Sequence, residues 1–373
     1  MSTSKYATAG LFFCVLAGCW LASIPIAEVV FRLLGDTPSP DMQGLFVPFA
    51  KGSYKLGALV DTQAFYASGP KTIHTDGLGL RCDGERRFAA KPGDAVDVLV
   101  LGDSQGFGNG VNFEESIGGT LAEIEAKGGY RVSNASVGGH NLPSQYELAR
   151  WLVDQRGLKV AKFVVFITPA MINSGNRQEQ VTVGDDGRLY GGGVGSATLI
   201  TLWIKTHLVI YSRVRDAVRN SGIGVNPAKA SSTVFEFYQV GKPTDAIRSD
   251  LLAGVKKLQG FASEHGANIY LVYVPLTVEA DFGPLKQAAA KSGMDLDPNV
   301  PLRITSWVAE RLHVPLYNLK PVLEKIRAEG RQLNVTGDFH YSPILSKACG
   351  SSLAAELKLP LKETQLARID TRR

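Results

Sequence analysis

The sequence is poor in the residues that build metal and redox sites. Only four cysteines occur among its 373 residues, and no two of them form a Cys-x-x-Cys pair, which excludes the common zinc and thiol-redox motifs. No group of histidine, cysteine and carboxylate residues has the spacing of metal ligands. We therefore predict neither a metal nor another cofactor. Cys82 and Cys349 lie outside the N-terminal segment, and an alternative is that they pair in an oxidising compartment.

Long runs of one charge are also absent. The net charge of +5 is spread over the whole chain, and basic residues stand in short groups such as Arg86-Arg87 and Arg372-Arg373. A nucleic-acid-binding surface needs a basic stripe or patch, often interleaved with aromatic residues. No nucleic-acid partner is expected.

A long apolar segment is present at the N-terminus, where residues 7–27 carry no charge. As a helix this segment is about 30 Å long, enough to cross the core of a bilayer. We predict that residues 1–35 form an uncleaved anchor and that the protein is a single-pass protein of the inner membrane, with its main domain in the periplasm or outside the cell. The alternative is a lipoprotein signal, because Leu16–Cys19 reads Leu-Ala-Gly-Cys, although the apolar run continues past it to Ile26.

Residues 36–94 are rich in glycine, proline and polar residues, which is typical of a linker with a small N-terminal extension. From residue 95 to 358, short apolar runs alternate with longer amphipathic stretches. The apolar runs predict strands over 96–102, 130–136, 161–168, 268–275 and 314–319. The longer stretches predict helices over 113–129, 144–155, 244–265, 304–312 and 344–357. This alternation indicates an α/β fold with a doubly wound five-stranded parallel sheet, followed by a C-terminal tail over 359–373.

An insertion over residues 173–240 interrupts this alternation. A hairpin is expected around Asp186-Gly187. Residues 199–220 predict a strongly apolar helix, which we interpret as packed on the domain. The alternative is a lid over the functional site or a surface that lies against the membrane.

The first apolar strand ends in Gly102-Asp103-Ser104-Gln105-Gly106 and then enters a glycine-rich stretch. The glycine spacing matches neither the dinucleotide-binding motif nor the phosphate-binding loop. Its Gly-x-Ser-x-Gly form matches the nucleophile turn of α/β-hydrolases, and the later order of Asp338 and His340 is compatible with that fold too. However, that fold places its serine after several strands, whereas Ser104 follows the first.

Two short blocks carry a resemblance. Gly102-Asp103-Ser104 resembles the first block of the SGNH, or GDSL-type, hydrolase superfamily, and Asp338-Phe339-His340 resembles its last. Residues 134–141, Asn-Ala-Ser-Val-Gly-Gly-His-Asn, are similar to its second block. The resemblance covers residues 95–358 and implies a flavodoxin-like sheet and a serine mechanism. It implies that His340 deprotonates Ser104 and that Asp338 orients the imidazole.

The resemblance also implies three donors for the oxyanion of acyl transfer: the backbone N–H groups of Ser104 and Gly139, and an asparagine side chain from a third block. Here the sequence departs from the family, because Thr168-Pro169-Ala170-Met171 stands where Gly-x-Asn-Asp is expected. Asn173 is the candidate for this third donor, with Asn176 as the alternative. Asp103 is interpreted as a structural residue, and His140 either lines the pocket or is structural.

An anchor followed by Gly79-Leu80-Arg81 and then this domain is similar to bacterial membrane-tethered SGNH proteins linked to exopolysaccharide acylation. The resulting hypothesis is an esterase or O-acyltransferase acting on acyl, above all acetyl, esters of a carbohydrate or cell-surface polymer. An exopolysaccharide export or acylation complex is the expected partner. Two alternatives remain: a lipid or thioester esterase, and a non-catalytic module that binds polysaccharide.

Overall fold

The computed structural model describes residues 23–33, 42–50, 53–66, 68–174, 181–191, 208–209, 235–241, 244–336 and 338–359. The chain divides into two units, one made of Met1–Pro40 and Gly193–Gly224, the other of Asp41–Gly192 and Val225–Arg373. In the first unit, residues 23–33 are helical. Most of the predicted anchor, nearly all of the predicted 199–220 helix and the tail from residue 360 lie outside the described residues. None of the helices within the described ranges is both long and apolar enough to span a bilayer.

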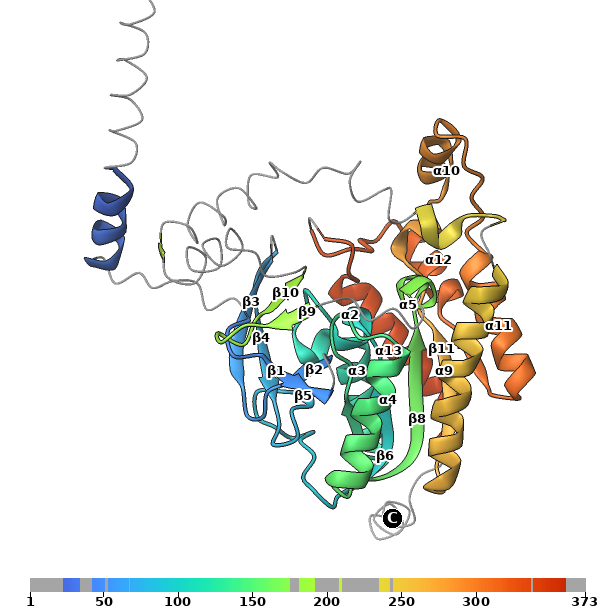
Figure 1. Ribbon diagram of the computed structural model, residues 1–373, viewed down its shortest axis with the longest axis horizontal. Coiled ribbons are helices and arrows are strands. Elements are labelled where there is room, and N and C mark those ends of the chain that lie inside the picture. Colours follow the sequence, from blue (N-terminus) through green and yellow to red (C-terminus); the bar gives the residue numbers. More distant parts are fainter. Residues whose placement is uncertain are drawn as a thin grey trace, which may run out of the picture. The chain divides into compact units, whose positions relative to one another are not determined.

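The second unit is built on an eight-stranded sheet with the order β12-β11-β8-β6-β7-β5-β4-β3 (Figure 1). Its strands are β3 (Asp61–Tyr66), β4 (Gly69–Thr75), β5 (Arg81–Cys82), β6 (Ala95–Leu101), β7 (Val132–Asn134), β8 (Lys159–Ile167), β11 (Asn268–Tyr273) and β12 (Leu316–Asn318). The five strands from β12 to β7 are parallel. Numbered along the chain, they stand in the order 5-4-3-1-2, which is the flavodoxin-like order read from the other edge. The predicted five-stranded parallel sheet is confirmed.

The remaining three strands of this sheet come from the region expected to be a linker and extension. β3, β4 and β5 are antiparallel to their neighbours, and β5 joins the parallel part through the pairing of Arg81 with Asn134 on β7. β1 (Phe46–Phe49) and β2 (Ser53–Leu56) form a separate antiparallel pair. Most of the described residues between 46 and 82 therefore form strands of this unit, which is more regular structure than the linker with a small extension that the sequence predicts.

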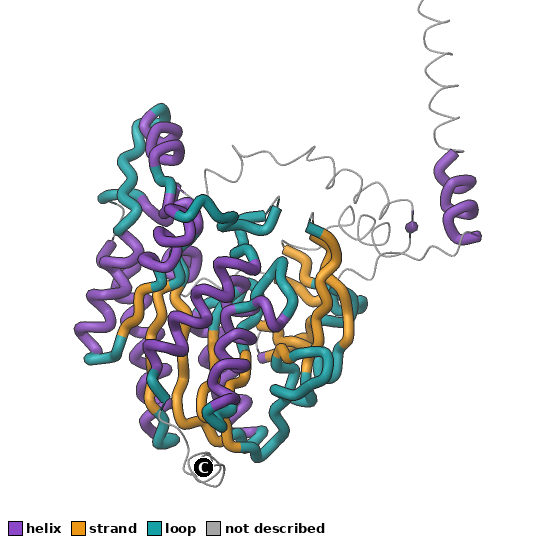
Figure 2. The backbone as a smooth tube through the Cα atoms, turned by 180° about the vertical axis from the view of Figure 1, so that it is seen from behind, coloured by secondary structure: helices purple, strands orange, loops and turns teal. Residues whose placement is uncertain are grey.

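Helices cover both faces of the parallel sheet, as Figure 2 shows from behind. On one face lie α4 (Leu142–Arg150), α9 (Thr244–Glu264) and α11 (Val300–Leu312), and on the other α3 (Ile117–Lys127), α12 (Lys320–Ala328) and α13 (Pro343–Leu357). Shorter elements complete the unit: α2 (Ser104–Phe107), α5 (Pro169–Ser174), α10 (Gly283–Ala290), a π-helical segment (Trp151–Gln155) and the 3-10 turns Phe113–Glu115 and Thr277–Ala280. The predicted hairpin around Asp186-Gly187 is present as β9 (Val181–Val183) and β10 (Leu189–Gly191).

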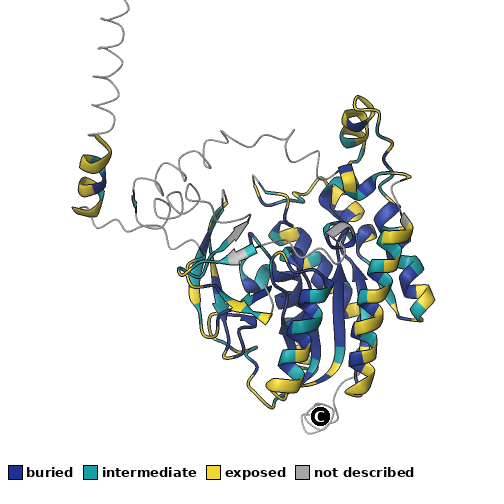
Figure 3. Ribbon diagram, viewed as in Figure 1, coloured by how far each residue is buried: buried dark blue, intermediate teal, exposed yellow. Residues whose placement is uncertain are grey.

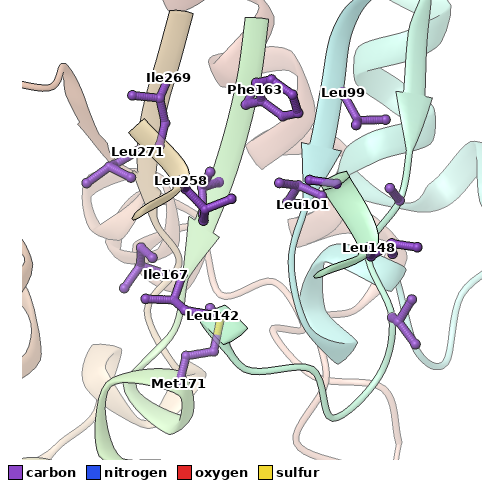
Figure 4. Close-up of a cluster of buried hydrophobic side chains, with 14 of the residues drawn as sticks. Leu99, Leu101, Leu142, Leu148, Phe163, Ile167, Met171, Leu258, Ile269 and Leu271 are labelled. Atoms are coloured by element: carbon purple, nitrogen blue, oxygen red, sulfur yellow. The ribbon is translucent and has the colours of Figure 1, made fainter. Parts of the chain in front are cut away.

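The strand sequences explain the two hydrophobic layers. Side chains alternate across a strand, so a run that is apolar at every position feeds both faces. On β6, Leu99 and Leu101 enter the layer with α4 and α9, while Val98 and Val100 enter the layer with α3 and α13. Figure 4 shows Leu99 and Leu101 in the first of these layers. Figure 3 shows that the central strands are buried over most of their length, and β6, β8 and β11 each begin with an exposed residue.

Cys82 and Cys349 are both buried, and both are free thiols. Cys82 lies on β5, whereas Cys349 lies on α13 in the second hydrophobic layer. The alternative that they form a disulfide is therefore wrong. Burial raises the pKa of both thiols above the ordinary value, which keeps them protonated and unreactive.

Candidate active site

Ser104 lies at the carboxyl end of β6, as the first residue of α2. Asp103 caps this short helix: one carboxylate oxygen accepts the backbone N–H of Gln105 at 2.9 Å, and the other accepts the Thr168 hydroxyl at 2.6 Å. Burial raises the pKa of Asp103, although these hydrogen bonds act in the opposite direction. Asp103 thus fixes the turn that presents Ser104, in agreement with its interpretation as structural.

Asp338 and His340 form the expected acid and base pair. Nδ1 of His340 lies 2.7 Å from Oδ1 of Asp338. A carboxylate accepts only, so Nδ1 carries the proton and Nε2 is left as an acceptor. Burial alone would raise the pKa of Asp338, but the hydrogen bonds from His340 and from the backbone N–H of Phe339 outweigh it and lower the pKa below its usual range. The carboxylate therefore stays ionised beside the imidazole.

Gln105 joins the serine turn to the histidine segment. Its buried side-chain amide donates to the carbonyl oxygen of Phe339 at 3.5 Å and accepts the backbone N–H of Tyr341 at 3.3 Å. The residue that follows Ser104 thus holds the backbone on both sides of His340. Asn109 makes a further contact, because its Nδ2 lies 3.5 Å from Nε2 of His340. The Gln105 and Asn109 contacts thus bring the first and last blocks of the SGNH resemblance to one place.

The second block supplies two glycines with different surroundings. A Cβ added to Gly138 would lie 3.8 Å from Cβ of Ser104, so Gly138 is the glycine that faces Ser104. Gly139 has a positive φ of 79°, and a Cβ there would meet the hydroxyl of Tyr54. Tyr54, on β2, donates to the carbonyl oxygen of Gly138 at 2.7 Å.

This hydrogen bond sets the direction of the Gly138–Gly139 peptide. The C=O and N–H of a trans peptide point to opposite sides, so the N–H of Gly139 points away from Tyr54. Within the described part of the chain, the backbone N–H groups of Ser104 and Gly139 have no hydrogen-bond acceptor. Both are the donors that the sequence resemblance implies, and their role stays a prediction.

The third block is where the structure departs most from the resemblance. After β8 the chain enters α5 at once, with Pro169 as its first residue and the Thr168 hydroxyl accepting the N–H of Met171 at 3.3 Å. This helix replaces the loop that would carry an asparagine. Asn173 lies in the last turn of α5, but its side chain is outside the described residues, as is all of Asn176.

His140 is structural. Its Nε2 donates to the carbonyl oxygen of Tyr54 at 2.7 Å, and its ring packs against the Tyr54 ring with centroids 5.1 Å apart. Burial lowers the pKa of His140 to about 4, so the imidazole is neutral near pH 7. Of the two interpretations of His140 made from the sequence, its burial and its contacts with Tyr54 support the structural one.

Sequence reasoning missed several residues of this site, namely Tyr54, Gln105, Asn109 and Gly138. Of these, only Gln105 and Gly138 could have been singled out from the sequence, because Gln105 follows Ser104 of the first block and Gly138 precedes Gly139 in the second. Across the described ranges, no three His, Cys, Asp or Glu side chains come together as a metal site.

No family model and no curated protein matches this chain. Among solved structures, it is similar to a protein assigned to the G-D-S-L lipolytic family from Desulfitobacterium hafniense (14% identity, 70% of this chain and 98% of that one, TM-score 0.36). It is also similar to an acetylxylan esterase from Geobacillus stearothermophilus (12% identity, 73% and 98%, TM-score 0.39) and to a further acetyl xylan esterase (15%, 70% and 100%, 0.38). Likenesses this distant carry no weight for activity. The resemblance to SGNH hydrolases holds instead at the chain's own residues, where the first and last blocks meet at the carboxyl ends of the parallel strands.

Proposed function

We propose that this chain is a serine esterase or O-acyltransferase that acts through an acyl-Ser104 intermediate. The observation that carries the proposal is that the Asp338–His340 pair is held beside the Ser104 turn by the Gln105 amide. An ionised carboxylate, an imidazole whose Nε2 can accept a proton and a serine at a strand-to-helix turn are the parts that nucleophilic acyl transfer requires.

In this mechanism, Nε2 of His340 takes the hydroxyl proton of Ser104 as Oγ attacks the ester carbonyl. The carbonyl electron pair moves onto oxygen, where the N–H groups of Ser104 and Gly139 stabilise it. Collapse of this adduct breaks the bond to the leaving alcohol, which receives the proton from Nε2. A water or a second hydroxyl then attacks the acyl-serine, again with His340 as the base, and the choice between them separates hydrolysis from transfer.

We propose acetyl or other short acyl esters of a carbohydrate or cell-surface polymer as substrates. Phe339 supports this class: the residue is 63% exposed, and its ring stacks on the His340 ring, with centroids 4.3 Å apart and an interplanar angle of 30°. An exposed aromatic ring beside the catalytic base provides an apolar face for a sugar ring that carries the ester. Attachment to the membrane through residues 7–27, a periplasmic or extracellular domain and an exopolysaccharide acylation partner belong to the same proposal.

Covalent labelling tests the catalytic role. The protein is incubated with a fluorophosphonate probe, and the modified residue is located by mass spectrometry. We expect labelling at Ser104 in the wild type and in the control Ser306→Ala, a serine on α11, and none in Ser104→Ala. Folded wild-type protein that resists the probe would contradict the proposal and favour a non-catalytic module that binds polysaccharide.

Substrate length tests the acyl group. We expect faster release of p-nitrophenol from the acetyl ester than from esters of eight or more carbons. A preference for the long esters would overturn the acetyl assignment and favour the lipid or thioester esterase, while leaving the serine mechanism intact.

A further inference from the structure

Asn109 lies at the edge of the nucleophile site. A Cβ placed on Gly138 would lie 3.9 Å from Nδ2 of Asn109 and 3.8 Å from Cβ of Ser104, and apart from its chain neighbours no other described atom comes within 4 Å. A small open space is therefore bordered by the nucleophile, by Asn109 and by the Gly138–Gly139 backbone. The carbonyl oxygen of an acyl group bound to Ser104 needs a space of this kind.

The loop that carries Asn109 is held by a buried arginine. The guanidinium of Arg81 donates to the carbonyl oxygens of Phe107, Gly108 and Val111, at 2.8 Å for Gly108 and 2.6 Å for Val111. It also stacks on the Phe107 ring, 4.4 Å from its centroid. Arg81 is only 2% exposed, and hydrogen bonds from a charged group in such a setting are strong. The 107–111 loop is thus fixed on both sides of Asn109.

The protonation state of His340 determines what Asn109 does. In the resting site Nε2 of His340 accepts, and the Asn109 amide faces it at 3.5 Å, at the long end of hydrogen bonding. When Nε2 takes the Ser104 proton, it becomes a donor and can no longer accept from Asn109. The amide N–H is therefore released in the same step that places negative charge on the carbonyl oxygen.

We propose that Asn109 is the side-chain donor to the oxyanion, in the role that the sequence resemblance assigns to an asparagine after β8. This inference rests on the proposed function, because it needs an acyl adduct on Ser104. The proposal places this donor away from the end of β8, where α5 begins at once. There the Thr168 hydroxyl holds Asp103, and Pro169 has no N–H to donate. Arg81 acts as a positioning residue for the loop.

Two measurements on Asn109→Ala test the donor role. With p-nitrophenyl acetate, we expect kcat to fall about 100- to 1000-fold with little change in KM, because one oxyanion donor typically contributes that much. With a trifluoromethyl ketone, which forms a tetrahedral oxyanion adduct on the serine, we expect the inhibition constant to rise by a similar factor. Asn268→Ala is the control, since Asn268 is an exposed asparagine at the other end of the parallel strands.

The proposal is overturned if Asn109→Ala retains kcat within a few-fold of the wild type. It is also overturned if kcat falls while the inhibition constant does not change, because that result assigns Asn109 to the orientation of His340. A large loss in Asn173→Ala or Asn176→Ala, without one in Asn109→Ala, would return the role to the third block. If the wild type forms no adduct with the ketone or with a fluorophosphonate, the proposed function itself fails, which is a distinct result.

Discussion

The Tyr54 hydroxyl donates a 2.7 Å hydrogen bond to the carbonyl oxygen of Gly138, which links a strand from before the parallel sheet to a loop at the active site. Tyr54 is buried, and its backbone carbonyl accepts from His140 on the same loop. The β1–β2 pair therefore sets the backbone beside the nucleophile. The region that precedes the parallel strands is therefore part of the structure around the proposed active site.

Tyr54→Phe should weaken catalysis more than folding. The ring remains to pack against His140, but the Gly138 carbonyl loses its partner and the Gly139 N–H loses its fixed direction. We expect a loss of about 1 kcal/mol in the free energy of unfolding and a fall of at least tenfold in kcat. Urea denaturation and ester hydrolysis measure the two. Unchanged kcat with reduced stability would show that the hydrogen bond does not position the donor.

Gly138 and Gly139 should respond to alanine in opposite ways. At Gly138 a methyl group makes only ordinary contacts and strains no backbone, so Gly138→Ala should fold as well as the wild type. It occupies the space beside Ser104, however, and should reduce kcat/KM at least tenfold. Gly139→Ala meets the Tyr54 hydroxyl in a left-handed backbone conformation and should lose about 2 kcal/mol or more. Thermal melts and kinetics of the pair check both statements, and full activity in Gly138→Ala would place the acyl group elsewhere.

Asp338→Asn should leave the fold intact and remove most of the activity. The amide presents an N–H to Nδ1 of His340, which moves the imidazole proton to Nε2 and prevents that atom from accepting the Ser104 proton. We expect kcat to fall about 10³- to 10⁴-fold. Asp281→Asn is the matched control, because Asp281 is exposed and pairs only with Arg327 among the described residues. A similar loss in both variants would contradict the assignment of Asp338.

His140 should make stability fall on acidification. Its pKa is about 4 in the folded state and 6.5 in the unfolded state, so the unfolded chain binds a proton that the folded chain does not as the pH drops from 6.5 towards 4. The free energy of unfolding should decrease over this window by about 3 kcal/mol from this group alone. Other groups titrate there too: the pKa of Glu279 is raised to about 7 by burial and acts with the opposite sign. The difference between the wild type and His140→Gln isolates the histidine, and parallel stability curves for the two would refute the prediction.

The parallel sheet and the first and last blocks could be predicted because local pattern determines them. β6 is apolar at nearly every position, as a strand covered on both faces must be, and Ser104 follows it directly. Helix starts were less predictable: α3 begins at Ile117 and not at residue 113, because the Ser116 hydroxyl caps it by accepting the N–H of Gly119 at 3.0 Å. The strands before residue 95 are short and partly polar, and only contact with the finished sheet identifies them.

The oxyanion donors depend on long-range contacts that a linear pattern does not encode. Asn109 stands in a glycine-rich stretch, and its relation to His340 depends on a loop that Arg81 holds from another strand. Tyr54 carries no motif at all. The helix after β8 was not predicted either. The sequence indicates a loop at Pro169, but the Thr168 hydroxyl accepts the N–H of Met171 and caps the start of α5 there.

The Gln105 amide also bears on the order in which the molecule assembles. It binds backbone atoms of Phe339 and Tyr341, more than two hundred residues away in the sequence. Contacts across such separations require the largest loops to close, and they form slowly compared with helices and neighbouring strands. The segments that carry Ser104 and His340 therefore come together only when the two ends of the domain have docked. During refolding from denaturant, the capacity to react with a fluorophosphonate should return later than the helical circular dichroism signal.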